Sequence, residues 1–353
     1  MKKVCIITMG NIYMAPYIYT YSSLIKGHLS IIYWDRESKN EKFEDATIYR
    51  YNEEIDYDSK IGKVSGFFGY RNFIKKILKK NRFDTIILLQ TWAALLIGDK
   101  LRKEYSNKYI VDIRDYTYEN FFAVKKYEQF IFKKAGLCVV SSNGYKSFLP
   151  KGKYFTTHNL REISQFDRIR IRNRSKAKAQ LNIAFIGVVS YQDQCKKLLL
   201  ALKNDKRFIL SFIGTRAIEL QAFCQNNNIK NVRLIDSFDS STIIDHYNDV
   251  DIVNNLYGNN TPILDYALSN KLYFAAEFAM PILVCPSTYM ETITNKYGIG
   301  ITIPKYNRSL GDYIWDSYHK IDWDEFTRSC DKFLSKAKME QQVFLKRIIK
   351  MLD

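Results

Sequence analysis

The chain has 353 residues, of which 46% are hydrophobic and 15% aromatic, and its 54 lysines and arginines exceed its 37 acidic residues to give a formal charge of +17. A single hydrophobic core stops growing at about 250–300 residues, so two packed domains are expected. The ordinary apolar content excludes a wholly disordered chain, and the scarcity of glycine (15) and proline (6) excludes collagen-like and low-complexity architectures.

The first 160 residues alternate short β-branched runs with longer helical patterns. The helical patterns place apolar residues three and four positions apart, as Phe73, Ile74 and Ile77 show. The run 86–89 is apolar on both faces, as a parallel strand covered by helices requires. This alternation predicts a doubly wound, open α/β sheet. Its strands are expected at 4–9, 29–34, 47–51, 85–90, 109–113, 137–141 and 154–157.

The segment 161–180 departs from this alternation. Seven basic residues stand against two acidic ones between Arg161 and Lys178, and every second position from 168 to 178 is an arginine or a lysine. Such a charge run favours a solvated connector between two domains. The alternative is a basic patch that faces anionic lipid or phosphate.

The same alternation restarts at residue 181 and predicts a second α/β domain. Strands are expected at 182–186, 208–213, 232–235, 251–255, 282–285 and 300–303, with helices from Pro304 to the end. The expected organisation is an N-terminal domain at 1–160, a basic linker at 161–180, a C-terminal domain at 181–310, and helices at 311–353 that pack back on the N-terminal domain. Ligands of open parallel sheets bind beyond the C-terminal ends of the strands, so two such domains suit group transfer from a donor to an acceptor.

The six cysteines have neither zinc-binding nor disulfide spacing, so a reducing compartment is expected. The apolar run 4–9 is shorter than the roughly 7–15 residues of an export signal, and the run 85–98 is shorter than the roughly 20 residues that span a bilayer. We therefore expect a cytoplasmic protein. Lysine clusters at 75–82 and 125–134 predict peripheral association with the inner, anionic face of the membrane.

The stretch 251–302 carries the most informative pattern. Ser269 or Asn270 can cap a helix whose first turn contains Lys271. Free backbone N–H groups, the positive end of the helix and the lysine ammonium would then converge on one point, as anion binding requires. The alternative is an ordinary capped helix that leads into a core strand.

This stretch resembles the C-terminal, nucleotide-sugar-binding half of GT-B-fold glycosyltransferases, especially the bacterial enzymes that assemble capsule, O-antigen and exopolysaccharide. The motifs that carry the resemblance are Ala-Phe-Ile-Gly at 184–187, Ser-Phe-Ile-Gly-Thr at 211–215, Asp-Val-Asp-Ile at 249–252, Tyr-Ala-Leu-Ser-Asn-Lys-Leu-Tyr at 266–273 and Pro-Ile-Leu-Val at 281–284. Together they cover about residues 180 to 305, in order. The resemblance implies two Rossmann-like domains and a transferase that uses a nucleotide-diphosphate sugar, with a UDP-sugar as the expected donor.

The resemblance also implies which residues bind the donor. Phe274 stands where the family commonly has the glutamate that holds the donor ribose, Glu277 follows three residues later, and Ala279 replaces a glycine. Lys271, the helix end and Arg216 would then meet the charge of the diphosphate through charge-assisted hydrogen bonds. The expected donor-binding residues are Gly187, Ser190, Gly214, Arg216, Ser237, Asn270, Lys271, Leu272 and Glu277.

In the first domain, the sequence Asp-Ile-Arg-Asp at 112–115 resembles the acceptor-domain segment of the same glycosyltransferases. Transfer to a hydroxyl needs a base or a positioning carboxylate near the acceptor oxygen, and cations or N–H groups at the leaving diphosphate. Asp115 is the preferred catalytic base. Asp112, which is expected to pair with Arg114, and Glu119 are the other catalytic candidates. The alternative is that both aspartates are structural partners of the arginine.

Gly10, Asn11, Arg114 and His158 are the remaining acceptor-side candidates. Gly10 and Asn11 follow the first strand, where the resemblance implies contact with the acceptor or the donor diphosphate. This turn is not a complete Gly-x-Gly-x-x-Gly, so no dinucleotide cofactor is expected. His158 ends the last strand of the first domain, where a structural hydrogen bond is the alternative to catalysis. No histidine–carboxylate spacing predicts a metal site, and the resemblance to GT-B enzymes implies a metal-independent enzyme without a cofactor.

The expected function is transfer of a sugar from a nucleotide-diphosphate sugar to a hydroxyl of a glycan carried on a polyprenyl diphosphate, in bacterial polysaccharide biosynthesis. A nucleotide-sugar epimerase of the same fold is the alternative, and it would form an isomer without an acceptor. The positive charge alone would also fit a nucleic-acid-binding protein. The sequence lacks both a basic helix with base-reading residues and an aromatic RNA-binding motif, so no nucleic-acid partner is expected.

Overall fold

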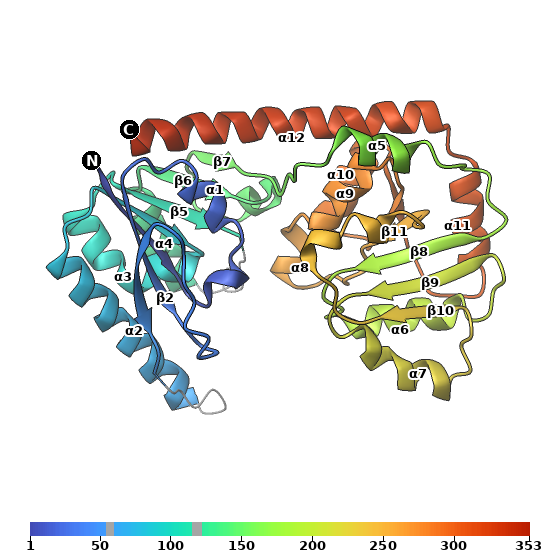
Figure 1. The fold of residues 1–353 in the computed structure, drawn as a ribbon, viewed down its shortest axis with the longest axis horizontal. Helices are drawn as coiled ribbons and strands as arrows, with labels where there is room; N and C mark the ends of the chain where they lie inside the picture. Colours follow the sequence, from blue (N-terminus) through green and yellow to red (C-terminus); the bar gives the residue numbers. More distant parts are fainter. Residues whose placement is uncertain (54–59, 115–121) are drawn as a thin grey trace. The chain divides into compact units, whose positions relative to one another are not determined.

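A computed structural model describes residues 1–53, 60–114 and 122–353 (Figure 1). The chain divides into two compact units: unit 1 comprises Met1–His158 and Met339–Asp353, and unit 2 comprises Asn159–Lys338. Each unit is built on one parallel β-sheet, of seven strands in unit 1 and six in unit 2 within the described residues. The predicted fold class, two doubly wound Rossmann-like α/β domains, is confirmed.

The sheet of unit 1 has the strand order β3-β2-β1-β4-β5-β6-β7. The order reverses between β1 and β4, and this switch point is where ligands of such sheets bind. Its strands are β1 (Lys3–Thr8), β2 (His28–Trp34), β3 (Ala46–Tyr51), β4 (Thr85–Leu89), β5 (Tyr109–Ile113), β6 (Leu137–Val140) and β7 (Tyr154–Thr156). The helices are α1 (Ile18–Ser22), α2 (Lys60–Lys80), α3 (Thr91–Glu104) and α4 (Phe122–Phe132), with the 3-10 turns η1 (Ile12–Met14) and η2 (Asn143–Ser147).

The sheet of unit 2 has the strand order β10-β9-β8-β11-β12-β13, with its switch point between β8 and β11. Its strands are β8 (Leu181–Ile186), β9 (Phe208–Ile213), β10 (Val232–Ile235), β11 (Ile252–Asn254), β12 (Ile282–Val284) and β13 (Gly300–Thr302). The helices are α5 (Gln165–Arg172), α6 (Gln192–Ala201), α7 (Gln221–Asn226), α8 (Pro262–Tyr266), α9 (Asn270–Glu277), α10 (Tyr289–Tyr297), α11 (Leu310–His319) and α12 (Trp323–Leu352). Three 3-10 turns complete it: η3 (Ala217–Leu220), η4 (Ser240–Thr242) and η5 (Asp245–Tyr247).

The core of unit 2 has two layers, one on each face of its sheet. Successive side chains of β8 alternate between them: Ile183 and Phe185 lie in the layer that includes α6, α7 and α11, whereas Ala184 and Ile186 lie in the layer that includes α5, α9 and α10. A strand with both faces covered is predominantly apolar, and β8 is buried throughout, with the side chain of its one polar residue, Asn182, hydrogen-bonded to the Asp249 carbonyl and the Ser211 hydroxyl. β8 ends at Ile186, and the turn that begins with Gly187 follows directly.

The segment 161–180 is not the solvated connector that its charge predicted. It forms α5, and Ile171 is fully buried in the core of unit 2. Arg172 donates to the last two main-chain carbonyls of α9, at 2.7 and 3.0 Å, and Arg174 binds two further main-chain carbonyls. Carbonyls at the end of a helix lack intrahelical partners and attract cations, so these arginines serve the packing of unit 2.

The C-terminal helices also differ from the expectation for residues 311–353. α11 and the first half of α12 pack on the core of unit 2, through side chains such as Ile314 and Phe333. Only the last turns of α12 belong to unit 1, where Phe344, Ile348 and Leu352 are buried in its core. A single long amphipathic helix therefore supplies apolar side chains to both units.

None of the described helices combines the length and the apolar character that crossing a membrane requires. All six cysteines are buried thiols without a disulfide partner.

Candidate functional site

Two glycine turns meet at the C-terminal edge of the unit 2 sheet. Gly187 follows β8 and Gly214 follows the neighbouring strand β9, with φ of 126° and 129°, values that side-chain-bearing residues rarely adopt. A Cβ atom on Gly214 would lie 2.3 Å from the carbonyl oxygen of Gly187. Glycine at both positions therefore lets the two turns touch and leaves main chain, rather than side chains, at this edge.

The start of α9 lies at the same edge. Of the two predicted caps, Ser269 is the one that caps the helix, because its Oγ accepts the N–H of Lys271 at 3.2 Å. A Cβ atom built on Gly187 would lie 3.7 Å from Nζ of Lys271, which places the amine beside the glycine turn. Asn270 is exposed at the first position of the helix, whereas Leu272 is fully buried and serves the core. The arrangement brings together the positive end of a helix, a lysine and a glycine turn.

The amine of Lys271 lies against aromatic rings. Its Nζ atom is 3.9 Å from the ring centroid of Phe185 and 4.7 Å from that of Tyr257, and it donates a hydrogen bond to the Tyr257 hydroxyl at 2.5 Å. Lys271 is 5% exposed, and burial lowers its pKa to about 7. In the part of the chain that the structure describes, no carboxylate pairs with it. Aromatic faces attract a cation but do not neutralise it, so this position favours an incoming anion.

The sequence did not single out Tyr257. Its only signal is an aromatic residue directly before Gly258, just beyond the strand expected at 251–255. Tyr257 also contacts Tyr191 edge-on, with ring centroids 5.4 Å apart, so the aromatic wall continues toward the loop that follows β8.

Three other predicted donor residues lie on the loops that follow β8, β9 and β10. The loop that contains Ser190 is joined to the turn after β9 by the N–H of Val189, which donates to the carbonyl of Thr215 at 2.9 Å. Arg216, at the same turn, pairs with Glu219, with Nε–Oε1 at 3.0 Å. Ser237 follows β10, and its Oγ lies 3.4 Å from that of Thr215. All three therefore stand at the edge that carries Gly187 and Gly214.

Glu277 is not brought to this edge. It ends α9, so the helix places it about 10 Å from the first residue. Its carboxylate, 4% exposed, pairs with Arg168 of α5 and lies 3.9 Å from the Lys338 amine. The geometry therefore makes Glu277 a partner of α5 and separates it from the start of the helix.

In unit 1, Asp112 is buried and fully engaged. Its Oδ2 accepts a hydrogen bond from the Tyr21 hydroxyl at 2.7 Å and lies 3.1 Å from Nε of Arg114. The guanidinium carbon of Arg114 lies 3.9 Å from the ring centroid of Tyr17. Asp112 is thus the structural partner of Arg114. The two other catalytic candidates, Asp115 and Glu119, lie outside the described residues.

The turn after β1 already carries a carboxylate. Glu41 accepts hydrogen bonds from the amides of Ile12 and Tyr13, both at 2.8 Å, and from the side chain of Asn11 at 2.9 Å. Asn11 is fully buried and also donates to Asp35 at 2.7 Å. The turn at Gly10 and Asn11 was expected to meet the acceptor or the donor diphosphate, and here the amides that follow Gly10 bind a side chain. Glu41 stands about 30 residues from this turn, and no local sequence pattern indicates the contact.

His158 belongs to a network with α12. Its Nε2 atom lies 2.8 Å from a carboxylate oxygen of Glu340, and its backbone N–H donates to Gln341 at 2.8 Å. Both partners come from the portion of α12 that belongs to unit 1. The structure therefore gives His158 structural hydrogen bonds. Within the described residues, no group of three or more histidine, cysteine, aspartate or glutamate side chains could hold a metal ion.

No protein-family profile matches the sequence, and no curated protein sequence matches it. Solved structures match the chain over its whole length. Sucrose-phosphate synthase from Thermosynechococcus elongatus is 11% identical, with a TM-score of 0.66 over 98% of this chain and 99% of that one. WaaG, a glycosyltransferase involved in lipopolysaccharide biosynthesis, is 10% identical, with a TM-score of 0.64 over 99% of each chain. HepE from Anabaena, in complex with UDP and glucose, is 10% identical, with a TM-score of 0.63 over 98% of this chain and 99% of that one. The chain consists of two units, each with one parallel sheet, and these solved structures match it over almost its whole length. The chain therefore has the GT-B fold that its resemblance to glycosyltransferases implied.

Proposed function

We propose that this chain is a glycosyltransferase that moves a sugar from a UDP-sugar to a hydroxyl of a lipid-linked glycan in bacterial polysaccharide biosynthesis. The observation that carries the proposal is Lys271, placed at the start of α9 beside the Gly187 turn and without a carboxylate partner among the described residues. A diphosphate bound there would lie at the positive end of the helix and face the ammonium. The complex of HepE with UDP and glucose supports a UDP-linked donor.

The chemistry requires stabilisation of the leaving diphosphate and activation or positioning of the acceptor hydroxyl. Lys271 and the start of α9 would supply the first, because negative charge develops on the leaving UDP as the glycosidic bond breaks. We assign the second to Asp115, with Glu119 as the other candidate. Asp112 keeps Arg114 in place, since both of its described partners are structural.

The surface of α4 supports the proposals of a lipid-linked acceptor and of a location on the inner face of the membrane. This helix exposes Phe122 (71%) and Phe130 (57%), and the Lys126 amine lies 4.6 Å from the ring centroid of Phe122. Aromatic rings beside lysines suit the headgroup region of an anionic bilayer. The net charge of +17 adds a long-range attraction to such a surface.

A screen of the whole chain against UDP-, GDP-, ADP- and dTDP-linked sugars, by thermal shift and then calorimetry, tests the donor. We expect a UDP-sugar to bind and the other bases to bind more weakly. Tighter binding of a sugar linked to another nucleotide, or no binding of any nucleotide sugar, would contradict the assignment.

Product analysis then separates a transferase from an epimerase. With the bound UDP-sugar and a lipid-linked glycan, we expect release of UDP and a longer glycan. An isomerised nucleotide sugar formed without any acceptor would assign an epimerase instead.

We also propose that the enzyme needs neither a metal ion nor a cofactor. Turnover in excess EDTA should equal turnover with Mg²⁺, and loss of activity that Mg²⁺ restores would show a metal requirement.

A further inference from the structure

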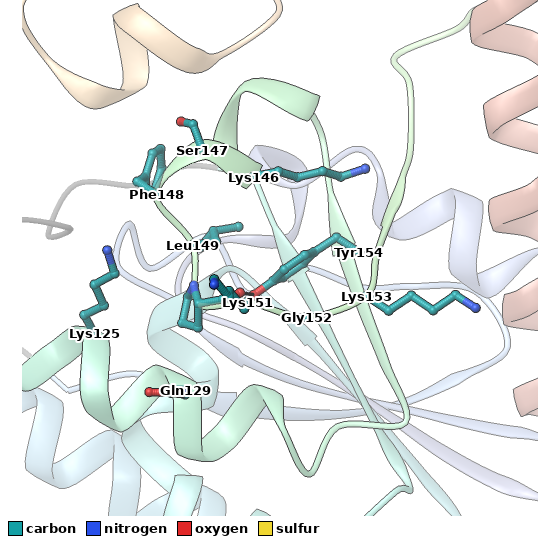
Figure 2. Close-up of a pocket in the computed structure, with 11 residues that line it drawn as sticks. Lys125, Gln129, Lys146, Ser147, Phe148, Leu149, Lys151, Gly152, Lys153 and Tyr154 are labelled. Carbon is teal, nitrogen blue, oxygen red and sulfur yellow. Dashed lines mark hydrogen bonds between the residues drawn. The ribbon is translucent and has the colours of Figure 1, made fainter.

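A pocket of about 900 Å³ lies on unit 1, between α4 and the loop that precedes β7 (Figure 2). We call it the lysine pocket, because Lys125, Lys146, Lys151 and Lys153 line it and no acidic residue does. An adjoining pocket of about 480 Å³ shares Lys151 and Lys153 and adds Lys133. The two pockets together gather five lysines and no carboxylate around one edge of the sheet.

The lining of the lysine pocket contains no acidic residue to offset its positive charge. Within the described residues, none of its four lysines forms an ion pair. Lys146 donates to the hydroxyl of Thr156 at 3.1 Å. Burial lowers the pKa of Lys146, and the charge of Glu340 of α12 acts in the opposite direction. Like charges around a concave, partly desolvated surface repel one another and focus a positive potential into it. An anion in this pocket would relieve that repulsion.

The shape and lining of the pocket indicate more than a single phosphate. Figure 2 shows Lys125 extending from α4, Lys146 from η2, and Lys151 and Lys153 from the loop before β7, so three separate segments supply the charge. The volume lies within the range of about 300–1,000 Å³ that holds ligands of drug size. The ring of Phe148 also lines it, and aromatic surface with a few polar groups is typical of pockets that orient an organic ligand.

We propose that the lysine pocket binds an anionic saccharide, a sugar that bears a phosphate or a carboxylate. Its identification as part of the acceptor glycan rests on the proposed function. The lysines would bind the phosphate or carboxylate, and Phe148 would pack on the apolar face of the sugar ring. A flat bilayer surface can contact the exposed face of α4 but not the lining of a pocket, so the geometry favours a saccharide over a lipid headgroup.

Calorimetric titration of the whole chain with glucose 6-phosphate, glucuronate oligosaccharides, maltose and inorganic phosphate tests the proposal. The pocket variant is Lys146→Gln with Lys151→Gln, and the matched control is Lys76→Gln with Lys79→Gln on α2, which removes the same charge from exposed positions of the same unit. We expect the acidic sugars to bind about tenfold or more weakly to the pocket variant, with the control unchanged. Equal loss in both variants, or maltose binding as tightly as the acidic sugars, would overturn the proposal.

Phe148 separates sugar recognition from simple anion binding. Phe148→Ala should weaken the binding of glucose 6-phosphate and leave the affinity for inorganic phosphate unchanged. If Phe148→Ala lowers the melting temperature, Phe148→Leu is the second variant. Inorganic phosphate that binds as tightly as glucose 6-phosphate would overturn the saccharide assignment. A second result would also overturn it: the parent chain binds no saccharide, and the pocket variant, but not the control, no longer co-sediments with phosphatidylglycerol vesicles.

UDP-sugar binding, measured on the same proteins, keeps the two proposals apart. The pocket variant should bind the nucleotide sugar as the parent does, because the lysine pocket and the start of α9 belong to different units. If the parent chain binds no nucleotide sugar, the proposed function fails while the saccharide titration still decides what the pocket binds.

Discussion

The amine of Lys271 lies 3.9 Å from the ring centroid of Phe185, the residue two positions before the glycine turn that ends β8. A lysine that points to solvent would present a hydrated charge to any ligand. This one is 5% exposed and rests on an aromatic ring, so an arriving diphosphate meets an amine that has already lost most of its water. The relationship links the strand that ends at the glycine turn to the helix that starts beside it, and it carries the first two predictions.

Replacement of Lys271 should weaken donor binding more than it affects folding. A charge-assisted hydrogen bond contributes about 1.5–3 kcal/mol, so Lys271→Ala should raise the Kd for the UDP-sugar roughly 10- to 150-fold. Lys271→Met keeps most of the buried volume and should show the same loss of affinity with a smaller loss of stability. Calorimetry with the donor measures the Kd of each variant, and urea denaturation measures its stability. Lys230→Ala, which replaces an exposed lysine just before β10, is the control. An unchanged Kd in both Lys271 variants would remove the donor site from the start of α9.

Donor affinity should also depend on pH through Lys271. Burial lowers its pKa to about 7, and a bound diphosphate favours the charged form, so binding takes up a proton when the pH lies above 7. The affinity should therefore fall as the pH rises from 7 to 9, by up to about tenfold per pH unit. Calorimetry in two buffers of different ionisation enthalpy measures the proton uptake. Lys271→Met should remove both effects, and a pH dependence that persists in this variant would assign it to another group.

The same pKa shift has a consequence for the stability of the unliganded chain. The unfolded state holds a proton on Lys271 up to its ordinary pKa near 10.5, whereas the folded state releases it near pH 7. Between these values the unfolded state binds more protons, so the free energy of unfolding rises with pH. The stability that Lys271 contributes is fully present above about pH 10.5 and is lost as the pH falls to about 7. Urea denaturation of the parent and Lys271→Met at pH 6.5 and 9 should show a larger gain at pH 9 for the parent. A gain of equal size in both proteins would contradict the assignment.

Asp112 should matter for stability. It is fully buried, accepts a hydrogen bond from Tyr21, and pairs with Arg114, which is 7% exposed. Removal of one partner of a buried ion pair leaves an uncompensated charge and costs about 3–5 kcal/mol, so Asp112→Ala should lower the urea midpoint strongly. Tyr21→Phe, which removes only one hydrogen bond of the same network, should cost about 1 kcal/mol. Similar, small effects of both changes would show that the pair carries no such charge.

Asp115→Asn should show the opposite pattern. Loss of a general base costs about 10²–10⁴ in rate, so kcat should fall by this factor while the Kd for the UDP-sugar and the urea midpoint stay unchanged. Turnover assays beside calorimetry with the donor measure the two effects. Glu119→Gln is the comparison, and a large fall in kcat there with none in Asp115→Asn would move the role to Glu119. Loss of donor binding in Asp115→Asn would contradict the assignment of this residue to the acceptor.

Association with anionic vesicles should depend on both salt and the aromatic face of α4. Electrostatic attraction weakens once the Debye length falls to about 8 Å near physiological salt, so co-sedimentation with phosphatidylglycerol vesicles should be strongest at low salt. Phe122→Ser with Phe130→Ser should reduce it at every salt concentration, whereas Phe68→Ser, an equally exposed ring on α2, should not. Absence of co-sedimentation at low salt would remove the peripheral membrane role.

The strands, the fold class and the cap of α9 follow from the sequence alone. β9 and β5 span the predicted residues 208–213 and 109–113, and the remaining described strands agree with their predictions to within one residue at each end. Such patterns are local: whether a run of side chains can be covered on both faces, or a serine can accept an N–H two residues on, depends on neighbours a few positions away. The alternation of these runs then predicts two doubly wound sheets and where each sheet presents its strand ends.

The partners of the candidate site residues were decided only by the tertiary structure. Phe185 lies 86 residues from Lys271, Tyr21 lies 91 residues from Asp112, and the arginines of 161–180 bind carbonyls that another helix and another loop provide. Periodicity does not specify which side chain of one element meets which side chain of another, because that depends on how whole helices and strands pack. The sequence therefore located the lysine at the start of a helix, and the packing of β8, the residues after β11 and α9 made it a buried cation with a pKa near 7.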